Sequence, residues 1–140
     1  MKVLIELPTW LGDAVMCSPA IENLVSNFQD LSITLIGSYA AIESIKGHPK
    51  VVNSYILEKN YMSFFRIVKD LDEFDIFFSF RSSLRSKFMK FCIFAKNKYQ
   101  FNNKIYRTGH RVEKYNKFVN DSININTNPG KLILHNIKIN

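Results

Sequence analysis

The stretch MKVLIELPTWLGDAVMCSPAIENL, residues Met1–Leu24, decides the fold that this sequence predicts. Within it, Val3–Leu7 is a short and almost wholly apolar run, which is typical of a parallel strand covered on both faces. Pro8–Gly12 interrupts this run, and from Asp13 the apolar residues recur at helical spacing. A strand that leads through a short turn into a helix is the first half of a βαβ unit, and ligands of open α/β sheets bind at such turns.

Asp13 is the one acid in this turn, and it has two interpretations. An aspartate at a helix start commonly caps free backbone N–H groups and is favoured by the positive end of the helix dipole. A carboxylate at the mouth of a ligand site can instead act as a base. Local chemistry by itself favours the capping interpretation.

Length and composition indicate one folded domain. The chain has 140 residues, of which 46% are apolar and 22% charged, as is typical of a soluble protein with a single core. No apolar run approaches the roughly 18 residues of a membrane span, and the N-terminal run, which contains Glu6, does not resemble a secretory signal. We therefore expect a cytoplasmic protein. Cys17 and Cys92 fit no metal or redox spacing, which predicts two buried thiols.

The net charge of +7 is concentrated in the second half of the chain. Residues 81–117 contain eleven Lys or Arg and a single acid, Glu113. This asymmetry predicts an anionic partner such as nucleic acid, a phosphorylated lipid or a membrane surface, although a solvated basic face without a partner stays open. Most aromatic residues of this segment fall at core spacing, which disfavours stacking on nucleic acid.

Strands and helices alternate along the chain after the first helix. We expect strands at 33–36, 51–57, 75–80 and 99–101, and helices at 39–45, 61–71, 84–95 and 110–119. This order predicts an α/β fold with a Rossmann-like parallel sheet flanked by helices. Residues 1–120 form the predicted domain, and residues 121–140 form a linker with a lone strand at 131–135 that leads toward a further domain.

Several familiar motifs are absent from the sequence. It contains no G-x-G-x-x-G, Walker A or G-x-S-x-G pattern, and its three histidines have no metal-ligand spacing. Asp70-Leu71-Asp72 has the D-x-D form of some metal-dependent sugar transferases. It follows a helix and precedes a strand, at the wrong end of the sheet for a ligand site, so we interpret it as a charged helix terminus.

Polar residues follow the carboxyl ends of three predicted strands. They are Thr9–Asp13, Ser38–Tyr39 and Arg81–Ser83, and the helix start at His110-Arg111 is compatible with the same rim. Parallel strands would bring these groups together. One carboxylate beside several hydroxyls and cations suits an anionic substrate that bears a hydroxyl group.

The sequence also resembles a known family. Leu7–Ile21, LPTWLGDAVMCSPAI, is similar to the N-terminal signature of glycosyltransferase family 9, the ADP-heptose:lipopolysaccharide heptosyltransferases. Within that family it most resembles the heptosyltransferase II members. The similarity covers most of residues 1–119 and continues through Ile33–Gly37, Gly47–Val51, Ser79–Ser82 and His110–Tyr115.

This resemblance implies the N-terminal, acceptor-binding domain of a GT-B glycosyltransferase. The implied reaction is an inverting, metal-independent transfer of heptose from ADP-heptose to a phosphorylated Kdo–lipid A inner core. The resemblance implies no cofactor, and it places the donor-binding contacts in a C-terminal domain that these 140 residues do not contain. It is compatible with peripheral contact at the cytoplasmic face of the inner membrane.

The resemblance also implies roles for particular residues. Asp13 matches the family's candidate catalytic base. The resemblance therefore favours interpreting Asp13 as a base, whereas local chemistry favours a helix cap. Gly12 would let the acceptor approach the backbone. Together with the rim residues, the candidates for acceptor binding are Thr9, Trp10, Gly12, Ser38, Arg81, Ser82, Ser83, Arg85, His110 and Arg111. Because the family's chains are considerably longer, we expect this chain to fold without transferring heptose alone. The alternative is a non-catalytic basic α/β module that binds an anionic glycolipid or nucleic acid.

Overall fold

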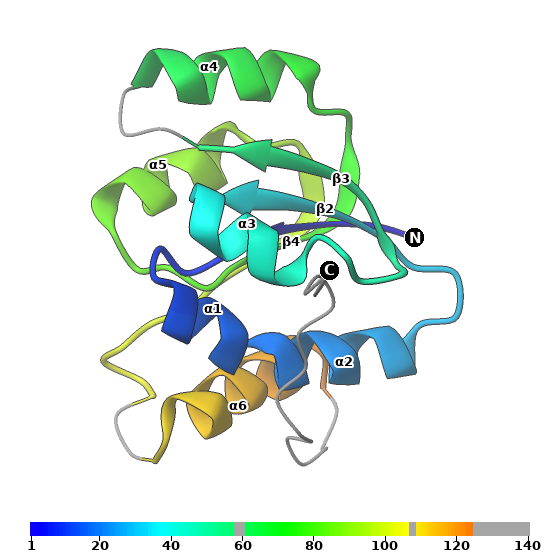
Figure 1. Ribbon diagram of the computed structural model, residues 1–140, viewed down its shortest axis with the longest axis vertical. Coiled ribbons are helices and arrows are strands. Elements are labelled where there is room, and N and C mark those ends of the chain that lie inside the picture. Colours follow the sequence, from blue (N-terminus) through cyan, green and yellow to red (C-terminus); the bar gives the residue numbers. More distant parts are fainter. Residues whose placement is uncertain (58–60, 107–108, 125–140) are drawn as a thin grey trace, which may run out of the picture.

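Five strands form one sheet in which every pair is parallel (Figure 1). The computed structural model describes residues 1–57, 61–106 and 109–124. The strands are β1 (Lys2–Glu6), β2 (Ser32–Gly37), β3 (Val51–Ile56), β4 (Phe74–Ser79) and β5 (Ala95–Gln100), in the spatial order β3-β2-β1-β4-β5. The α/β prediction is therefore confirmed, and β1 lies at the centre of the sheet.

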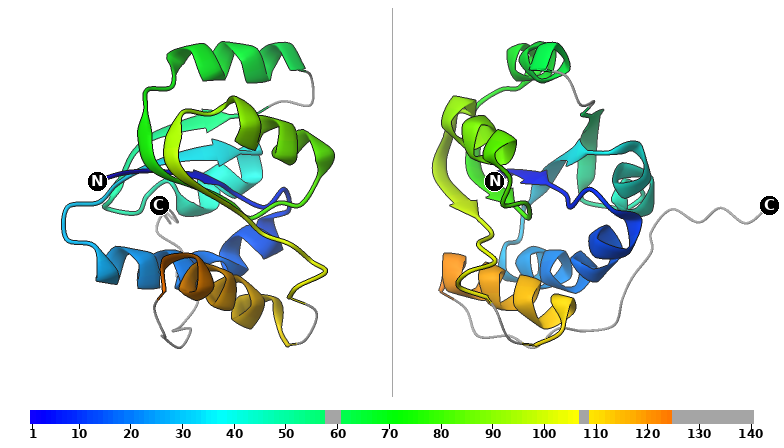
Figure 2. Two further views of the ribbon diagram at one scale, coloured as in Figure 1. Left: turned by 180° about the vertical axis from the view of Figure 1, so that it is seen from behind. Right: turned by 90° about the vertical axis from the view of Figure 1, so that its left-hand side faces the viewer.

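Helices cover both faces of this sheet (Figure 2). One face is covered by α1 (Leu11–Met16), α2 (Ser18–Asn27), α3 (Tyr39–Ile45) and α6 (Arg111–Ile123), and the other by α4 (Tyr61–Asp70) and α5 (Leu84–Cys92). Successive strand residues point to opposite faces. Val3 and Ile5 therefore join the core under α1 and α2, whereas Leu4 joins the core under α4 and α5.

The segment after β1 forms two helices where the sequence predicts one. Pro19 lacks the N–H group that would continue the helix by bonding to the carbonyl of Val15. The Ser18 hydroxyl donates to that carbonyl instead, at 2.7 Å. The chain bends at Cys17, whose thiol donates to the carbonyl of Ala14 at 2.9 Å.

Three predicted boundaries differ from the observed ones by three or more residues. The strand expected at 99–101 begins at Ala95, four residues earlier than predicted. The helix expected at 84–95 ends at Cys92, because Ala95 already pairs with Phe74 in the sheet and the Phe94 carbonyl accepts from the Phe74 N–H at 2.9 Å. Farther along the chain, α6 continues to Ile123, three residues into the predicted linker, and ends at Asn124 in the left-handed conformation. The strand expected at 131–135 lies outside the described residues.

The apolar side of α5 faces outward, contrary to the expectation of core spacing. Ser86 and Met89 are buried, whereas Leu84, Phe88 and Phe91 are exposed. The two cysteines also differ from each other. Cys17 is buried, and burial raises the pKa of its thiol, but Cys92 is only half-buried, so the prediction of two buried thiols is right for Cys17 alone. No described helix is long and apolar enough to cross a membrane.

Candidate functional site

The carboxyl ends of β1 and β4 meet at the point where the connections from the sheet diverge to either side. In open α/β sheets this switch point is where ligands bind. The β1–α1 turn, the residues after β4 and the start of α6 all contribute polar side chains here. We call these groups the polar rim.

Asp13 lies in the first turn of α1 and is not the capping residue. The helix begins at Leu11, with Trp10 at the N-cap position. The Asp13 side chain keeps 29% of its surface exposed, and its Oδ1 atom lies 3.9 Å from Nε of Arg111. Asp13 therefore does not occupy the N-cap position, although its carboxylate lies in the first turn, near the positive end of the helix dipole. The carboxylate is accessible and lies beside the Arg111 cation of α6.

A series of contacts connects Asp13 to the residues after β4. Arg111 donates from Nη1 to Oδ1 of Asn103 at 3.5 Å, and Nδ2 of Asn103 donates to the Ser82 hydroxyl at 3.0 Å. The Arg111 guanidinium also lies 5.7 Å from the ring centre of Tyr115, within the range of a cation–π contact. The structure thus brings together Asp13, Ser82 and Arg111, which the sequence only predicts to share a rim.

Beneath the rim lies a buried acid that sequence reasoning missed. Glu6 ends β1 with no exposed surface, and its Oε1 accepts a hydrogen bond of 2.5 Å from the Ser79 hydroxyl. Its Oε2 lies 3.8 Å from Nη1 of Arg81 and has no hydrogen-bond partner among the described residues. Burial raises the pKa of the Glu6 carboxyl, while Ser79 and Arg81 act in the opposite direction. The sequence feature that could have predicted this buried acid is the presence of a single glutamate in an otherwise apolar strand.

Glu6 helps to position Arg81 at the rim. The Arg81 carbonyl accepts a hydrogen bond of 3.1 Å from Nε2 of Gln100, which fixes its backbone. The Arg81 side chain is three-quarters buried, and its Nη1 atom lies beside Glu6. A guanidinium held in this way is suited to a phosphate or carboxylate group. Arg85 is half-buried, and its charge also acts on Glu6.

Three of the predicted site residues have structural partners at helix starts. Ser38 and Ser83 accept hydrogen bonds from the backbone N–H groups of Ala41 and Ser86, so they cap α3 and α5. His110 accepts from the Val112 N–H at 3.3 Å and caps α6. The remaining three are exposed: Thr9 and Trp10 lie on the β1–α1 turn, and Gly12 lies in the first turn of α1. A methyl group added at Gly12 would meet nothing within 4 Å.

A hollow lined by lysines adjoins the rim beyond Ser82. Its volume is about 360 Å³, and it is lined by Ser82, Lys87, Lys90, Gln100, Phe101, Asn102, Asn103 and Lys104. These residues include three lysines and no acid. The hollow therefore favours an anionic group and shares Ser82 and Asn103 with the contacts that lead to Asp13.

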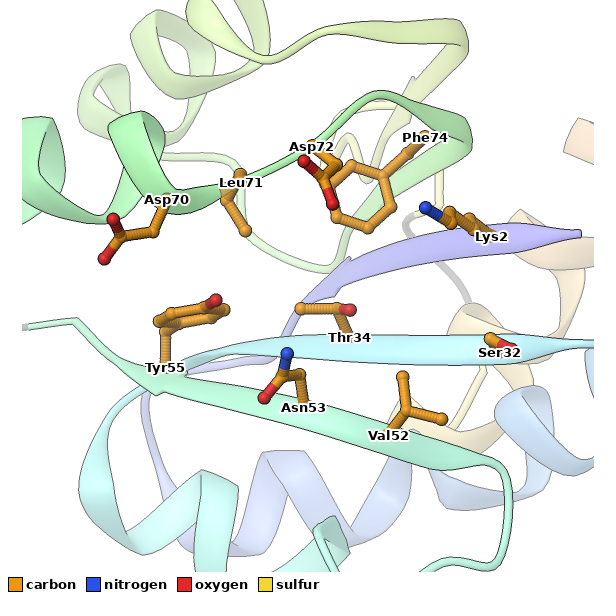
Figure 3. A pocket seen from close by; sticks show the side chains of 10 residues that line it. All are labelled: Lys2, Ser32, Thr34, Val52, Asn53, Tyr55, Asp70, Leu71, Asp72 and Phe74. Atoms are coloured by element: carbon orange, nitrogen blue, oxygen red, sulfur yellow. The ribbon is translucent and has the colours of Figure 1, made fainter.

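A second hollow lies at the opposite end of the sheet (Figure 3). Its volume is about 200 Å³, and its lining includes Lys2 and Ser32 at the starts of β1 and β2 together with Asp70 and Asp72. The D-x-D sequence is therefore remote from the polar rim, as the sequence predicts.

Comparison with known proteins relates the chain to heptosyltransferases. It is 36% identical over 129 residues to lipooligosaccharide heptosyltransferase 2 of Campylobacter jejuni serotype O:2, and 35% identical to that of serotype O:6. The match covers 89% of this chain but 40% of each relative. No model of a known protein family matches the chain.

The solved structures that the chain resembles in fold include heptosyltransferases and a family 9 glycosyltransferase. Escherichia coli heptosyltransferase WaaC, with ADP-2-deoxy-2-fluoro heptose, matches 94% of the chain and 51% of its own length, with a TM-score of 0.78 and 12% identity. A family 9 glycosyltransferase from Veillonella parvula matches 95% and 44%, with a TM-score of 0.75 and 13% identity. E. coli ADP-heptose lps heptosyltransferase II matches 100% and 47%, with a TM-score of 0.70 and 15% identity.

These matches confirm the predicted fold, a Rossmann-like domain of a GT-B glycosyltransferase. The chain spans about two fifths of the length of its curated relatives. The chain is thus similar in sequence to lipooligosaccharide heptosyltransferases and in fold to a family 9 glycosyltransferase, which confirms the resemblance stated from its sequence.

Proposed function

We propose that this chain is the acceptor-binding half of an inverting heptosyltransferase. The whole enzyme would transfer heptose from ADP-heptose to the inner core of lipopolysaccharide or lipooligosaccharide. The observation that carries the proposal is the accessible Asp13 carboxylate, held 3.9 Å from Arg111 at the carboxyl end of the sheet. We infer that the transferred sugar is heptose because the similar proteins are named as heptosyltransferases.

In this proposal Asp13 is the catalytic base. It takes the proton from a hydroxyl group of the acceptor while that oxygen attacks the anomeric carbon of the donor. The bond from this carbon to the ADP oxygen breaks, and ADP leaves with the electron pair on the face opposite the attack. Arg111 orients the carboxylate, since its own position is fixed by Asn103 and the Tyr115 ring.

The cations of the rim would bind the anionic groups of the acceptor. Arg81 offers a partly exposed side chain, and the lysine-lined hollow lies next to Ser82. Phosphorylated Kdo–lipid A carries both phosphates and carboxylates, which such groups recognise. Arg85, Thr9 and Trp10 stay candidates for further contacts. The capping roles of Ser38, Ser83 and His110 account for these side chains without a ligand.

The domain assignment is part of the same proposal. Residues 1–120 would form the acceptor-binding domain, and residues 121–140 would lead toward a domain that binds most of ADP-heptose. The chain would act in the cytoplasm, near the membrane that holds the acceptor. It would bind the acceptor without transferring heptose alone.

Acceptor binding is the first test of the proposal. The 140-residue chain is titrated with a heptosylated Kdo–lipid A acceptor and with single-stranded DNA at two salt concentrations. We expect acceptor binding that Arg81→Gln weakens about tenfold and Asp13→Asn leaves nearly unchanged, because a base contributes mainly in the transition state. Salt-sensitive binding of DNA without binding of the acceptor would favour a nucleic-acid function instead.

Catalysis is tested in a chimera. Residues 1–120 of this chain, the proposed acceptor-binding domain, replace the corresponding N-terminal segment of Campylobacter jejuni lipooligosaccharide heptosyltransferase 2, and transfer from ADP-heptose is measured. We expect Asp13→Asn to lower kcat by at least a hundredfold with little change in KM. A chimera that binds both substrates and keeps its kcat after Asp13→Asn would rule out the base assignment. Turnover by the 140-residue chain alone would contradict the proposed division between two domains.

A further inference from the structure

The outward surfaces of α4 and α5 carry several large apolar side chains that are exposed. On α5, Leu84 and Phe91 keep 84% and 83% of their surface exposed, and Phe88 beside them is also exposed. On α4, Met62 and Phe65 are exposed in the same way. Large apolar side chains gathered on one surface usually mark an interaction site.

These side chains form one continuous surface. The ring centroids of Phe65 and Phe88 lie 6.5 Å apart, and both rings contact the buried Phe64. In Figures 1 and 2, α4 and α5 lie together on one side of the sheet, away from α2 and α6. We call Met62, Phe65, Arg66, Lys69, Leu84, Lys87, Phe88 and Phe91 the α4–α5 face.

The charges on this face are all positive. Exposed Arg66 and Lys69 accompany Met62 on α4, and exposed Lys87 lies one turn from Leu84 and Phe91 on α5. No acid occurs in α5, and the one acid of α4 is its last residue, Asp70, which lines the hollow at the far end of the sheet. Together the two helices carry five Lys or Arg residues and one acid, Asp70. An apolar surface with this excess of positive charge complements a surface that is apolar inside and anionic outside.

We propose that the α4–α5 face docks on a membrane that contains anionic lipids. Aromatic and aliphatic side chains would enter the boundary between head groups and acyl chains, while Lys and Arg pair with lipid phosphates. Leu84 directly follows Ser83 of the polar rim, so docking would hold that rim beside the bilayer. The proposal goes beyond heptose transfer, because it requires neither acceptor nor donor.

Vesicle binding tests this proposal. The 140-residue chain is mixed with phosphatidylcholine vesicles, with and without phosphatidylglycerol, and the bound fraction is measured by co-sedimentation. We expect binding only to the anionic vesicles and release at high salt. Phe91→Gln should weaken binding about tenfold, because an exposed ring no longer enters the lipid. Lys87→Gln should weaken it about fivefold.

Two matched variants serve as controls. Ile105→Gln removes an exposed apolar side chain from the loop after β5, and Lys117→Gln removes an exposed lysine from α6 on the other face of the sheet. Both should bind anionic vesicles as the unsubstituted chain does. Circular dichroism checks that all four variants are folded.

Three results would overturn the proposal. Equal binding to neutral and anionic vesicles would remove the role of the cations, and unchanged binding by Phe91→Gln would remove the role of the face. The third is a self-association, measured by sedimentation equilibrium, that Phe91→Gln abolishes while vesicle binding is absent. That result would assign the face to a second copy of the chain. Because these vesicles contain no lipopolysaccharide precursor, failure here would leave the proposed acceptor binding untouched.

Discussion

At the scale of single residues, Glu6 makes stability depend on pH. Burial raises the pKa of its carboxyl above the usual value of 4.5, so the folded chain holds this proton more tightly than the unfolded chain does. The contribution is fully present below that usual value and is lost as the pH rises through the folded-state pKa. Glu6→Gln keeps an acceptor for the Ser79 hydroxyl but cannot ionise. We expect urea denaturation of Glu6→Gln to show a smaller decline in unfolding free energy as the pH rises.

Asp75 provides a contrasting control for that experiment. Its carboxylate accepts a hydrogen bond from the Lys2 N–H at 2.8 Å, and this bond lowers the pKa of Asp75. Its contribution is present above the unfolded-state pKa and is lost as the pH falls through the folded-state pKa. Asp75→Asn should therefore change the pH dependence of the unfolding free energy in the direction opposite to the change caused by Glu6→Gln. An identical pH slope for Glu6→Gln and the unsubstituted chain would contradict the account of Glu6.

Two glycines should respond in opposite ways to alanine. Gly12 is exposed inside α1 and has open space where a Cβ would stand, so Gly12→Ala should stabilise the fold by about 0.5–1 kcal/mol. Gly109 has a φ of +97°, and a Cβ there would lie 2.7 Å from Oε2 of Glu113, so Gly109→Ala should destabilise it by at least about 1 kcal/mol. Thermal and urea unfolding measure both changes.

Gly12→Ala also tests the proposed approach of the acceptor to the backbone. If the acceptor passes close to Gly12, the added methyl group should weaken acceptor binding although it strengthens the fold. Unchanged acceptor affinity in a stabilised variant would exclude this role for Gly12.

At the scale of the elements, Ser38 joins α3 to the turn that carries Asp13. Its hydroxyl accepts from the Ala41 N–H at 3.3 Å and donates to the Thr9 carbonyl at 2.7 Å. Ser38→Ala should therefore cost about 1–2 kcal/mol of unfolding free energy. Ser26→Ala is the matched control, because the Ser26 hydroxyl bonds only to the exposed carbonyl one turn earlier in α2, and it should cost less than about 0.5 kcal/mol. Equal losses in the two variants would contradict the capping role.

Local signals account for the elements that the sequence predicts well. The bounds of α3 match because a serine cap precedes it and Lys46-Gly47 follows it. Pro19 is also a local signal for the break between α1 and α2. The prediction missed this break because the apolar residues on both sides of it have helical spacing. The end of α5 could not be read locally, because pairing of Ala95 with β4 overrides the preceding helical pattern.

The site follows the same division between local and long-range information. Parallel topology was enough to predict that Asp13 and the residues after β4 share a rim. The Arg111–Asn103–Ser82 contacts depend on side chains from separate elements, as does the pairing of Glu6 with Arg81. Nothing in the spacing of Leu84, Phe88 and Phe91 shows that the apolar side of their helix faces outward, because the same spacing would serve a core.

At the scale of the whole molecule, one sheet joins two cores. Phe77 belongs to the core under α4 and α5, and its neighbour Phe78 belongs to the core under α2 and α6. Phe77→Ala and Phe78→Ala should each cost about 3–5 kcal/mol. Because both cores depend on β4, we expect a single urea transition with an unchanged m-value in either variant. A separate transition for one core would contradict this coupling.

The central place of β1 has a consequence for synthesis of the chain. This strand leaves the ribosome before the other four strands of the sheet, and β2 can pair with one of its edges early. Its other edge must wait for β4, whose Ile76 and Phe78 pair with Val3 and Ile5. Until then the nascent polypeptide presents an open apolar edge, of the kind that exposes incomplete chains to aggregation or chaperone capture. A pause in translation before Phe74 would therefore endanger this protein more than a pause after Gln100.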